Sequence, residues 1–373
     1  MKKNKTAELF LVLLILIVMS AGILILQNGM EKLQSVEQQS VYVPETRDLY
    51  NNYGLKNDQF LSKTKILETQ DQVIYTDRIF NINQISEDHI SYAADIMKAL
   101  QKKSGKDTYI MPIPERAVFE SGYENEKEKY SDFTEKLEAS FSDPSVVLNP
   151  LSELEKHQYE YIYFRTGNSW TMRGAFYGAQ VIWGELGYDK ENLDAYREYV
   201  FGTFEGNLLL EALEKYTTDE IKKDIENMEK EPFYIYMNGS NPNREELTFE
   251  NKAGQLQTLK RQMIQFNSSG SNAVIGSDYD HSIVEGKGKG QRKGNLLLIA
   301  DTRGKMMISY LSEIFEKVYV SNIYEDVDLI QNLDEILEKY NIEYVIWAQD
   351  VAETGNRSYM KALNPLLKEG GNV

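Results

Sequence analysis

The chain has 373 residues with 41 basic and 58 acidic side chains, a formal net charge of −17, and its 42% of hydrophobic residues excludes wholesale disorder. A chain this acidic is repelled by phosphate backbones, so no nucleic acid is expected as a partner. The absence of cysteine excludes disulfides, thiolate metal sites and a cysteine nucleophile, and histidine occurs only at His89, His157 and His281.

The N-terminal segment has the features of a membrane anchor. Lys2, Lys3 and Lys5 precede an apolar run from Leu9 to Leu26, whose 18 residues would span about 27 Å as a helix, close to the hydrocarbon thickness of a bilayer. Because cleaved signal peptides usually have a shorter apolar region, residues 1–27 are predicted to be a retained signal anchor, with cleavage at the small residues near position 20 as the alternative. Lysines before such a helix stay in the cytoplasm, so the rest of this single-pass chain is predicted to be extracytoplasmic, at the cell membrane.

A polar stalk or lead-in over residues 28–72 is expected before one domain over residues 73–373. From position 73, short apolar runs alternate with amphipathic stretches, which is typical of an α/β fold. The last third is predicted to be a βαβαβ succession with parallel strands and helices of about four turns. An irregular insertion is expected over about 189–290. The predicted strands are 73–80, 108–112, 146–148, 161–164, 296–300, 318–320 and 344–347, and the predicted helices include 85–102, 307–315 and 329–337.

Two segments place polar residues directly after a predicted strand. The first reads Arg-Thr-Gly-Asn-Ser-Trp-Thr from Arg165 to Thr171 and leads into a helix with small residues on one side. The second reads Asp-Thr-Arg-Gly from Asp301 to Gly304 and also leads into a helix. In open α/β sheets, ligands bind and reactions take place just beyond the carboxyl ends of the strands. Both segments are therefore candidate parts of one site.

These segments resemble the catalytic blocks of the DHHW and alginate O-acetyltransferase-like branch of the SGNH hydrolases. In that branch one strand ends in Asp-Ser-Phe-Gly, whose serine is the nucleophile, and an earlier strand ends in Arg-Thr-Asp-His-His-Trp-Thr, which supplies the Asp and His of the triad. The resemblance implies an SGNH hydrolase-like, flavodoxin-like, mostly parallel sheet flanked by helices. It also implies a setting in which relatives act with membrane acyltransferases on exported polysaccharides, so a polysaccharide or such an acyltransferase is the expected partner.

The departures from the family pattern fall on the triad itself. Gly167 stands at the aspartate position, Ser169 at the base position and Thr302 at the nucleophile position. A hydroxyl nucleophile needs a base held by a third group, and neither Gly167 nor Ser169 can supply one. Catalysis of the family type is therefore expected to be lost. The remaining site residues are expected to bind a ligand without any cofactor or metal, and they are Arg165, Asn168, Trp170, Asp301, Arg303 and His281.

Two alternatives stay open at this point. Thr302 could act with a relocated base, either His281 or a carboxylate, in an active O-acetyltransferase or esterase. The domain could also be a structural, partner-binding ectodomain whose former cleft is filled by Trp170 and Arg303.

Several charged residues have two interpretations. Arg165, Arg173 and Arg303 could converge on an anionic or polyhydroxylated ligand, or Arg165 could form a structural pair with Asp301. The acidic runs at 124–128 and 224–231 are interpreted as solvated helix faces. His89 is expected to be a packing residue, His157 a solvated surface residue and His281 an exposed loop residue.

Overall fold

The computed structural model describes residues 85–119, 124–204, 206, 231–238, 246–250, 256–262, 281–285 and 293–369. The predicted anchor, stalk and opening strand (73–80) lie outside these residues. In the part of the chain that is described, no helix combines the length and apolar character needed to cross a membrane.

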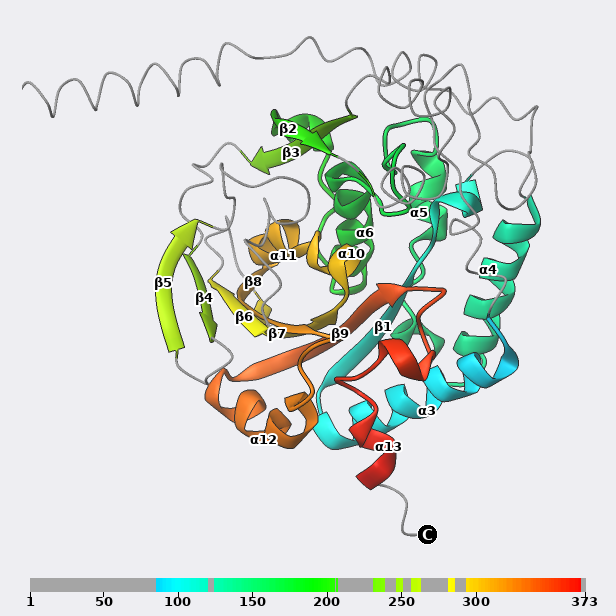
Figure 1. The fold of residues 1–373 in the computed structure, drawn as a ribbon, viewed down its shortest axis with the longest axis vertical. Coiled ribbons are helices and arrows are strands. Elements are labelled where there is room, and N and C mark those ends of the chain that lie inside the picture. Colours follow the sequence, from blue (N-terminus) through cyan, green and yellow to red (C-terminus); the bar gives the residue numbers. More distant parts are fainter. Residues whose placement is uncertain are drawn as a thin grey trace, which may run out of the picture. The chain divides into compact units, whose positions relative to one another are not determined.

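Four parallel strands form one side of the seven-stranded sheet that the described residues make (Figure 1). They are β1 (Asp107–Ile113), β9 (Ile342–Asp350), β7 (Lys293–Ala300) and β8 (Phe315–Asn322), and they lie side by side in that order. β9 pairs in parallel with β1 on one side and with β7 on the other, and β7 pairs in parallel with β8. The predicted parallel strands of the α/β fold are thus confirmed on this side of the sheet.

The insertion after position 189 adds further strands. β6 (His281–Glu285), β4 (Glu246–Glu250) and β5 (Leu256–Gln262) extend the sheet beyond β8, and each pairs antiparallel with its neighbour. β2 (Tyr196–Phe204) and β3 (Glu231–Asn238) form a separate antiparallel pair. The insertion is therefore more regular than its composition predicts.

Helices cover both faces of the sheet. α6 (Met172–Glu185) and α11 (Ile308–Ile314) pack on one face, and α3 (Glu87–Ser104) and α12 (Leu329–Lys339) pack on the other. α11 and α12 have 7 and 11 residues, so the prediction of four-turn helices is wrong for these two. The other helices among the described residues are α4 (Glu124–Glu138), α5 (Leu151–Lys156), α10 (Thr302–Lys305) and α13 (Pro365–Glu369), with short 3-10 helices at Arg116–Phe119, Pro144–Val146, Leu193–Ala195 and Arg357–Tyr359.

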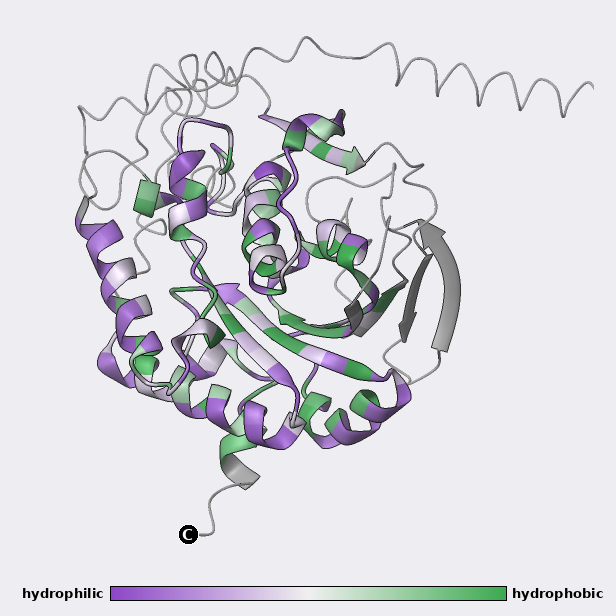
Figure 2. Cartoon of the chain, turned by 180° about the vertical axis from the view of Figure 1, so that it is seen from behind, coloured by the Kyte–Doolittle hydropathy of each residue, from purple (hydrophilic) through white to green (hydrophobic). Residues whose placement is uncertain are grey.

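The burial of β7 explains why its sequence is apolar without alternation. Leu296 and Leu298 belong to the core cluster that contains α6 and α11, whereas Leu297 and Ile299 belong to the cluster that contains α3 and α12. Successive side chains of a strand point to opposite faces, so a strand covered on both faces reads as a continuous hydrophobic run. Figure 2 shows the same distribution, with hydrophobic strands between helices that are hydrophilic on their outer sides.

Two predicted strands are reduced to single bridges. Residues 146–148 meet the sheet only where Val147 bridges to Ile110, and residues 161–164 form one antiparallel bridge from Tyr163 to Trp170. The second segment folds back on itself, because Phe164 N donates to Ser169 O at 3.0 Å. It therefore forms a tight loop before α6, where the sequence predicts a sheet strand.

Candidate functional site

The ends of β7 and β9 meet where the connections of the sheet change direction. β7 leads through α10 and α11 on one face to β8, and β8 leads through α12 on the other face to β9, which lies on the far side of β7. In open α/β sheets this switch point is the usual place for ligands and chemistry. Asp301 and Thr302 follow β7 at this point, and β9 ends there at Asp350.

Asp301 joins the ends of these two strands. One carboxylate oxygen accepts the backbone N–H of Gly304 at 2.8 Å and caps α10, while the other accepts the backbone N–H of Asp350 at 3.0 Å. Gly304 allows α10 to approach β9 closely, since a Cβ at this position would lie 2.6 Å from the carbonyl oxygen of Ala348. The family aspartate and glycine that this chain retains thus have a structural role.

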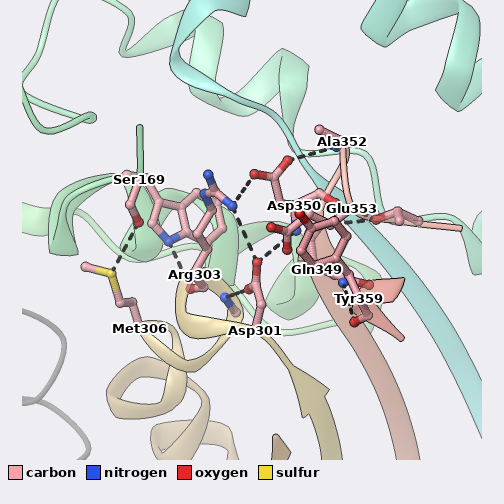
Figure 3. A network of polar contacts seen from close by, with 12 residues as sticks. Ser169, Asp301, Arg303, Met306, Gln349, Asp350, Ala352, Glu353 and Tyr359 are labelled. Carbon is pink, nitrogen blue, oxygen red and sulfur yellow. Dashed lines mark hydrogen bonds and ion pairs between the residues drawn. The ribbon is translucent and has the colours of Figure 1, made fainter. Parts of the chain in front are cut away.

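Arg303 completes a buried ion-pair network. Its guanidinium forms an ion pair with Asp350 and lies 3.6 Å from the carboxylate of Asp301, and the residue is only 7% exposed (Figure 3). Burial lowers the pKa of Arg303, but the two carboxylates outweigh it and raise that pKa overall. Burial also raises the pKa of the Asp350 carboxyl to about 6 against the opposing effect of Arg303. The site therefore holds more acidic groups than its arginine balances.

Glu353 belongs to the same acidic group. Burial, with Asp350 and Asp301 nearby, raises its pKa to about 7, and the hydroxyl of Tyr324 donates a hydrogen bond to it. The sequence pattern does not single out Asp350 or Glu353, because Asp350 comes three residues after the predicted strand 344–347, whereas Asp301 comes directly after the predicted strand 296–300. Among the described residues, no three or more His, Asp or Glu side chains are arranged to hold a metal ion.

The three triad positions hold no acid–base group. Thr302 is exposed at the start of α10, and no hydrogen bond joins its hydroxyl to another described residue. The Ser169 hydroxyl points to the sulfur of Met306 at 3.9 Å (Figure 3). Gly167 contributes only its backbone, whose carbonyl accepts a hydrogen bond from Arg116 at 3.2 Å. A hydroxyl at position 302 therefore has no described base beside it.

Trp170 links the two sequence blocks. Its side chain is fully buried, and its indole N–H donates to the carbonyl oxygen of Arg303 at 3.0 Å. Gly174 makes room for it, because a Cβ there would lie 2.8 Å from the Cβ of Trp170 and 2.3 Å from the carbonyl oxygen of Ile162. The close approach that this glycine permits is to the loop before α6. Asn168 lies in the preceding loop and is half-buried.

Arg165 pairs with Glu231 on β3, 3.7 Å away, so the expected pairing with Asp301 is wrong. Glu231 also accepts the backbone N–H of Thr166 at 2.9 Å. It is 1% exposed, so its assignment to a solvated helix face is corrected as well. On the other side, Arg116 donates to the carbonyls of Phe164 and Arg165, both at 2.8 Å. The triad-position loop is held from both sides by buried charges.

The three arginines have different carboxylate partners and do not share one ligand position. Arg173 lies 2.9 Å from Glu160 and 3.5 Å from Glu198, while Arg165 pairs with Glu231 and Arg303 with Asp350. Each is placed by an internal ion pair. The expected convergence of the arginines on an anionic ligand is not what the structure shows.

The histidines lie away from Thr302. His281 is the first residue of β6 and lies opposite Ser321 of β8, and Ser321 in turn lies opposite Ile299 of β7. The backbone of His281 is therefore two strands, or about 10 Å, away from β7 across the sheet. Its assignment to a loop is corrected, since it belongs to a strand. His89 accepts the backbone N–H of Ser86 at 3.1 Å and caps α3. His157 lies 2.7 Å from Glu160 and is half-buried, so it is not simply a solvated residue.

Comparison with known proteins finds a family match and structural relatives. The model of the family described as "DHHW protein" matches residues 73–321. A DHHW family protein from Eubacterium siraeum superimposes with a TM-score of 0.61 at 19% identity, covering 75% of this chain and 89% of that one. PatB1 of Bacillus cereus, solved with a sulfonyl adduct, gives a TM-score of 0.54 at 13% identity, covering 80% and 99%. The O-acetyltransferase domain of Pseudomonas putida AlgJ gives 0.47 at 10% identity, covering 82% and 99%. No curated protein matches the chain in sequence.

Proposed function

This chain belongs to the DHHW family, and from that premise we propose that it is a member in which the family's catalysis has been lost. It would be a membrane-anchored, extracytoplasmic SGNH hydrolase-like protein. Its role would be an accessory or ligand-binding one in the O-acetylation of cell-surface polysaccharides. Its partners would be the membrane, through residues 1–27, and a polysaccharide or a membrane acyltransferase.

The observation that carries the loss of catalysis is the state of the three triad positions. The Thr302 hydroxyl has no hydrogen-bond partner among the described residues, the Ser169 hydroxyl faces a sulfur atom, and position 167 has no side chain. Removing triad members costs on the order of 10⁴–10⁶ in kcat. The substitution of the family phenylalanine by Arg303 points the same way, because Arg303 has become part of a buried ion-pair network.

Ester hydrolysis tests this proposal. We expect the wild-type chain and Thr302→Ala to hydrolyse an acetyl ester such as p-nitrophenyl acetate at the same background rate. The triple variant Gly167→Asp, Ser169→His and Thr302→Ser rebuilds the triad on the retained frame, and turnover above background by this variant would show that only the chemistry is missing. Its matched control is the same variant with alanine in place of serine at position 302. Robust wild-type turnover that Thr302→Ala abolishes would contradict the proposal.

One observation favours an active enzyme as the second candidate. The pKa values of Asp350 and Glu353 are raised to about 6 and about 7, which is the range of a general acid or base at neutral pH. Asp350 ends β9 and Glu353 follows it, and the neighbouring strand β7 leads into Thr302. A relocated base among these carboxylates predicts wild-type hydrolysis that falls with both Thr302→Ala and Glu353→Gln. His281 is a weaker candidate because its backbone lies two strands from β7.

The third candidate is a structural, partner-binding ectodomain. It is favoured by the burial of Trp170 and Arg303, whose side chains fill the space between the two sequence blocks. This candidate predicts neither turnover nor glycan binding, and it would be identified by a protein partner that binds equally to wild type and Thr302→Ala.

A further inference from the structure

Two loops meet across the end of β7. The loop after β8 carries Tyr324, and the loop after β9 carries Glu353 and Tyr359. Because β7 lies between β8 and β9 in the sheet, a contact between these loops bridges over the strand that leads into Thr302. The two loops therefore border the triad positions on the sheet edge.

The side chains of these loops are held in place by one another. The Tyr324 hydroxyl donates to the carboxylate of Glu353, and the Tyr324 ring meets the Tyr359 ring edge to face, with 6.4 Å between centroids and 73° between planes. A backbone hydrogen bond of 3.0 Å from Ala362 N to Ile323 O joins the same loops. The two rings and the carboxylate thus have fixed relative positions, which lowers the entropic cost of binding.

These loops are unusual in what they expose. Among the described residues, three large hydrophobic side chains are exposed, and two of them, Val327 and Tyr359, lie here at 54% and 44% exposure. Glu353 beside them is half-buried. An exposed ring next to a fixed carboxylate matches the surface of a sugar, whose C–H face packs on the ring while its hydroxyls donate to the carboxylate.

The charge around the rings selects among sugars. Residues 323–328 contain Glu325, Asp326 and Asp328 and no basic residue. The loop with Glu353 also carries Arg357 and Lys361, so the two loops together hold four acidic and two basic side chains and keep a net negative charge. Asp350, at the end of β9, adds a further acidic group close to Glu353. The nearby Arg357 packs its guanidinium on the ring of Tyr92 at 4.5 Å. With a chain charge of −17 in addition, a sugar bearing carboxylates would meet a repulsive field.

We propose that Tyr324, Glu353 and Tyr359 form a glycan-binding subsite that accepts an uncharged sugar chain and rejects a uronate chain. The inference rests on the proposed function and deepens it, because it names the class of polysaccharide that the accessory role would serve.

Calorimetric titration of the full chain tests the subsite with two probes. These are the uncharged hexasaccharide of N-acetylglucosamine and a hexasaccharide of mannuronate. We expect the uncharged probe to bind more tightly than the uronate. Tyr359→Ala should weaken its binding about five- to tenfold, which is the scale of one aromatic contact, while Tyr359→Phe should stay within about twofold of wild type. Tyr159→Ala is the matched control, since Tyr159 is 67% exposed and lies outside these loops.

Glu353→Gln tests the charge selection. At pH 8, above the raised pKa of about 7 of this carboxyl, replacing it with an amide should narrow the preference for the uncharged probe over the uronate. Three results would overturn the inference: no binding of the uncharged probe at millimolar concentration, uronate bound as tightly as the uncharged probe, or equal losses in Tyr359→Ala and Tyr159→Ala. Assaying wild type and Thr302→Ala for ester hydrolysis in parallel with the titrations separates the two proposals. Hydrolysis that depends on Thr302 would contradict the loss of catalysis, whereas the binding results would still decide the subsite.

Discussion

In two charged clusters of this molecule, the pKa values of the carboxyl groups are shifted in opposite directions. At the ends of β7 and β9, Arg303 is surrounded by Asp301, Asp350 and Glu353, and the pKa values of the last two are raised to about 6 and about 7. Beside α6, burial raises the pKa of Glu160, but hydrogen bonds from His157 and Tyr177 and the charge of Arg173 outweigh it and lower that pKa to about 2. The balance of donors and acceptors, and not burial alone, decides the sign of the shift.

This contrast separates a site that can exchange protons from one that serves packing. Glu160 is a single acceptor among donors, and it stays ionised at any physiological pH. The cluster at the strand ends contains more acidic groups than its one arginine neutralises, so two of its carboxyl groups gain and lose protons close to neutral pH.

The largest effect is expected when the arginine of the strand-end cluster is removed. Arg303→Met leaves the carboxylates of Asp301 and Asp350 buried without a counter-charge, which should lower the free energy of unfolding by about 3–5 kcal/mol. Urea denaturation measures it. The double variant Arg303→Met with Asp350→Asn should recover a large part of the lost stability. Ordinary surface substitutions change the free energy of unfolding by less than about 1 kcal/mol, so a change that small in Arg303→Met would contradict this account.

The second prediction concerns pH. Because the folded-state pKa values of Asp350 and Glu353 lie above their ordinary values, folding takes up protons, and this contribution to stability is present at low pH and is lost as pH rises through about 6 to 7. Between pH 5 and pH 8 the protein should lose about 4 kcal/mol from these groups. Glu353→Gln should flatten the profile and be more stable than wild type at pH 8. Thermal unfolding across pH measures both, and an unchanged slope in Glu353→Gln would disprove the assignment.

The Glu160 cluster should show the opposite slope. The pKa of Glu160 lies below its ordinary value, so its contribution is present above about pH 4.5 and is lost as pH falls toward 2. Glu160→Gln should cost about 1–2 kcal/mol at pH 7, because Arg173 and Tyr177 lose a charged acceptor. The loss should shrink when stability is measured near pH 3. A cost that is the same at both pH values would show that packing, and not charge, accounts for it.

The smallest effect is expected at the nucleophile position. Thr302 is exposed and its hydroxyl has no described hydrogen-bond partner, so Thr302→Ala should change the free energy of unfolding by less than about 0.5 kcal/mol. Chemical denaturation measures it, with Asp301→Asn as the comparison, since that change weakens the link between the strand ends and should cost more.

The parts of the fold that the sequence predicts are those that depend on neighbours along the chain. The apolar run of β7 predicts a buried strand, because a continuous hydrophobic sequence is typical of a strand covered on both faces. The small residue Gly174 predicts a close contact of α6, and the structure shows one with Trp170 and Ile162. The triad substitutions at Gly167, Ser169 and Thr302 were also readable from the sequence, since they lie inside short blocks.

Residues whose partners come from distant segments could not be assigned in this way. Glu231 reads as one acid in a charged run, and its burial depends on a loop 65 residues earlier. The sequence offers Asp301 as a partner for Arg165 because both belong to the retained family pattern, whereas the carboxylate that pairs with Arg165, Glu231, lies in the insertion. Glu353 looks like an ordinary loop acid until the strand order brings it beside Tyr324.

The strand order has a consequence for how the protein is made. β9, which begins at Ile342, fits between β1 and β7, so the strand synthesised last occupies the middle of the parallel sheet. Until it is available, β1 and β7 each have an unpaired edge, and such edges are templates for aggregation. The nascent chain therefore has to be kept from associating with other copies until about nine-tenths of it has emerged. The time for which these edges stay exposed is therefore set by how long the chain takes to complete β9.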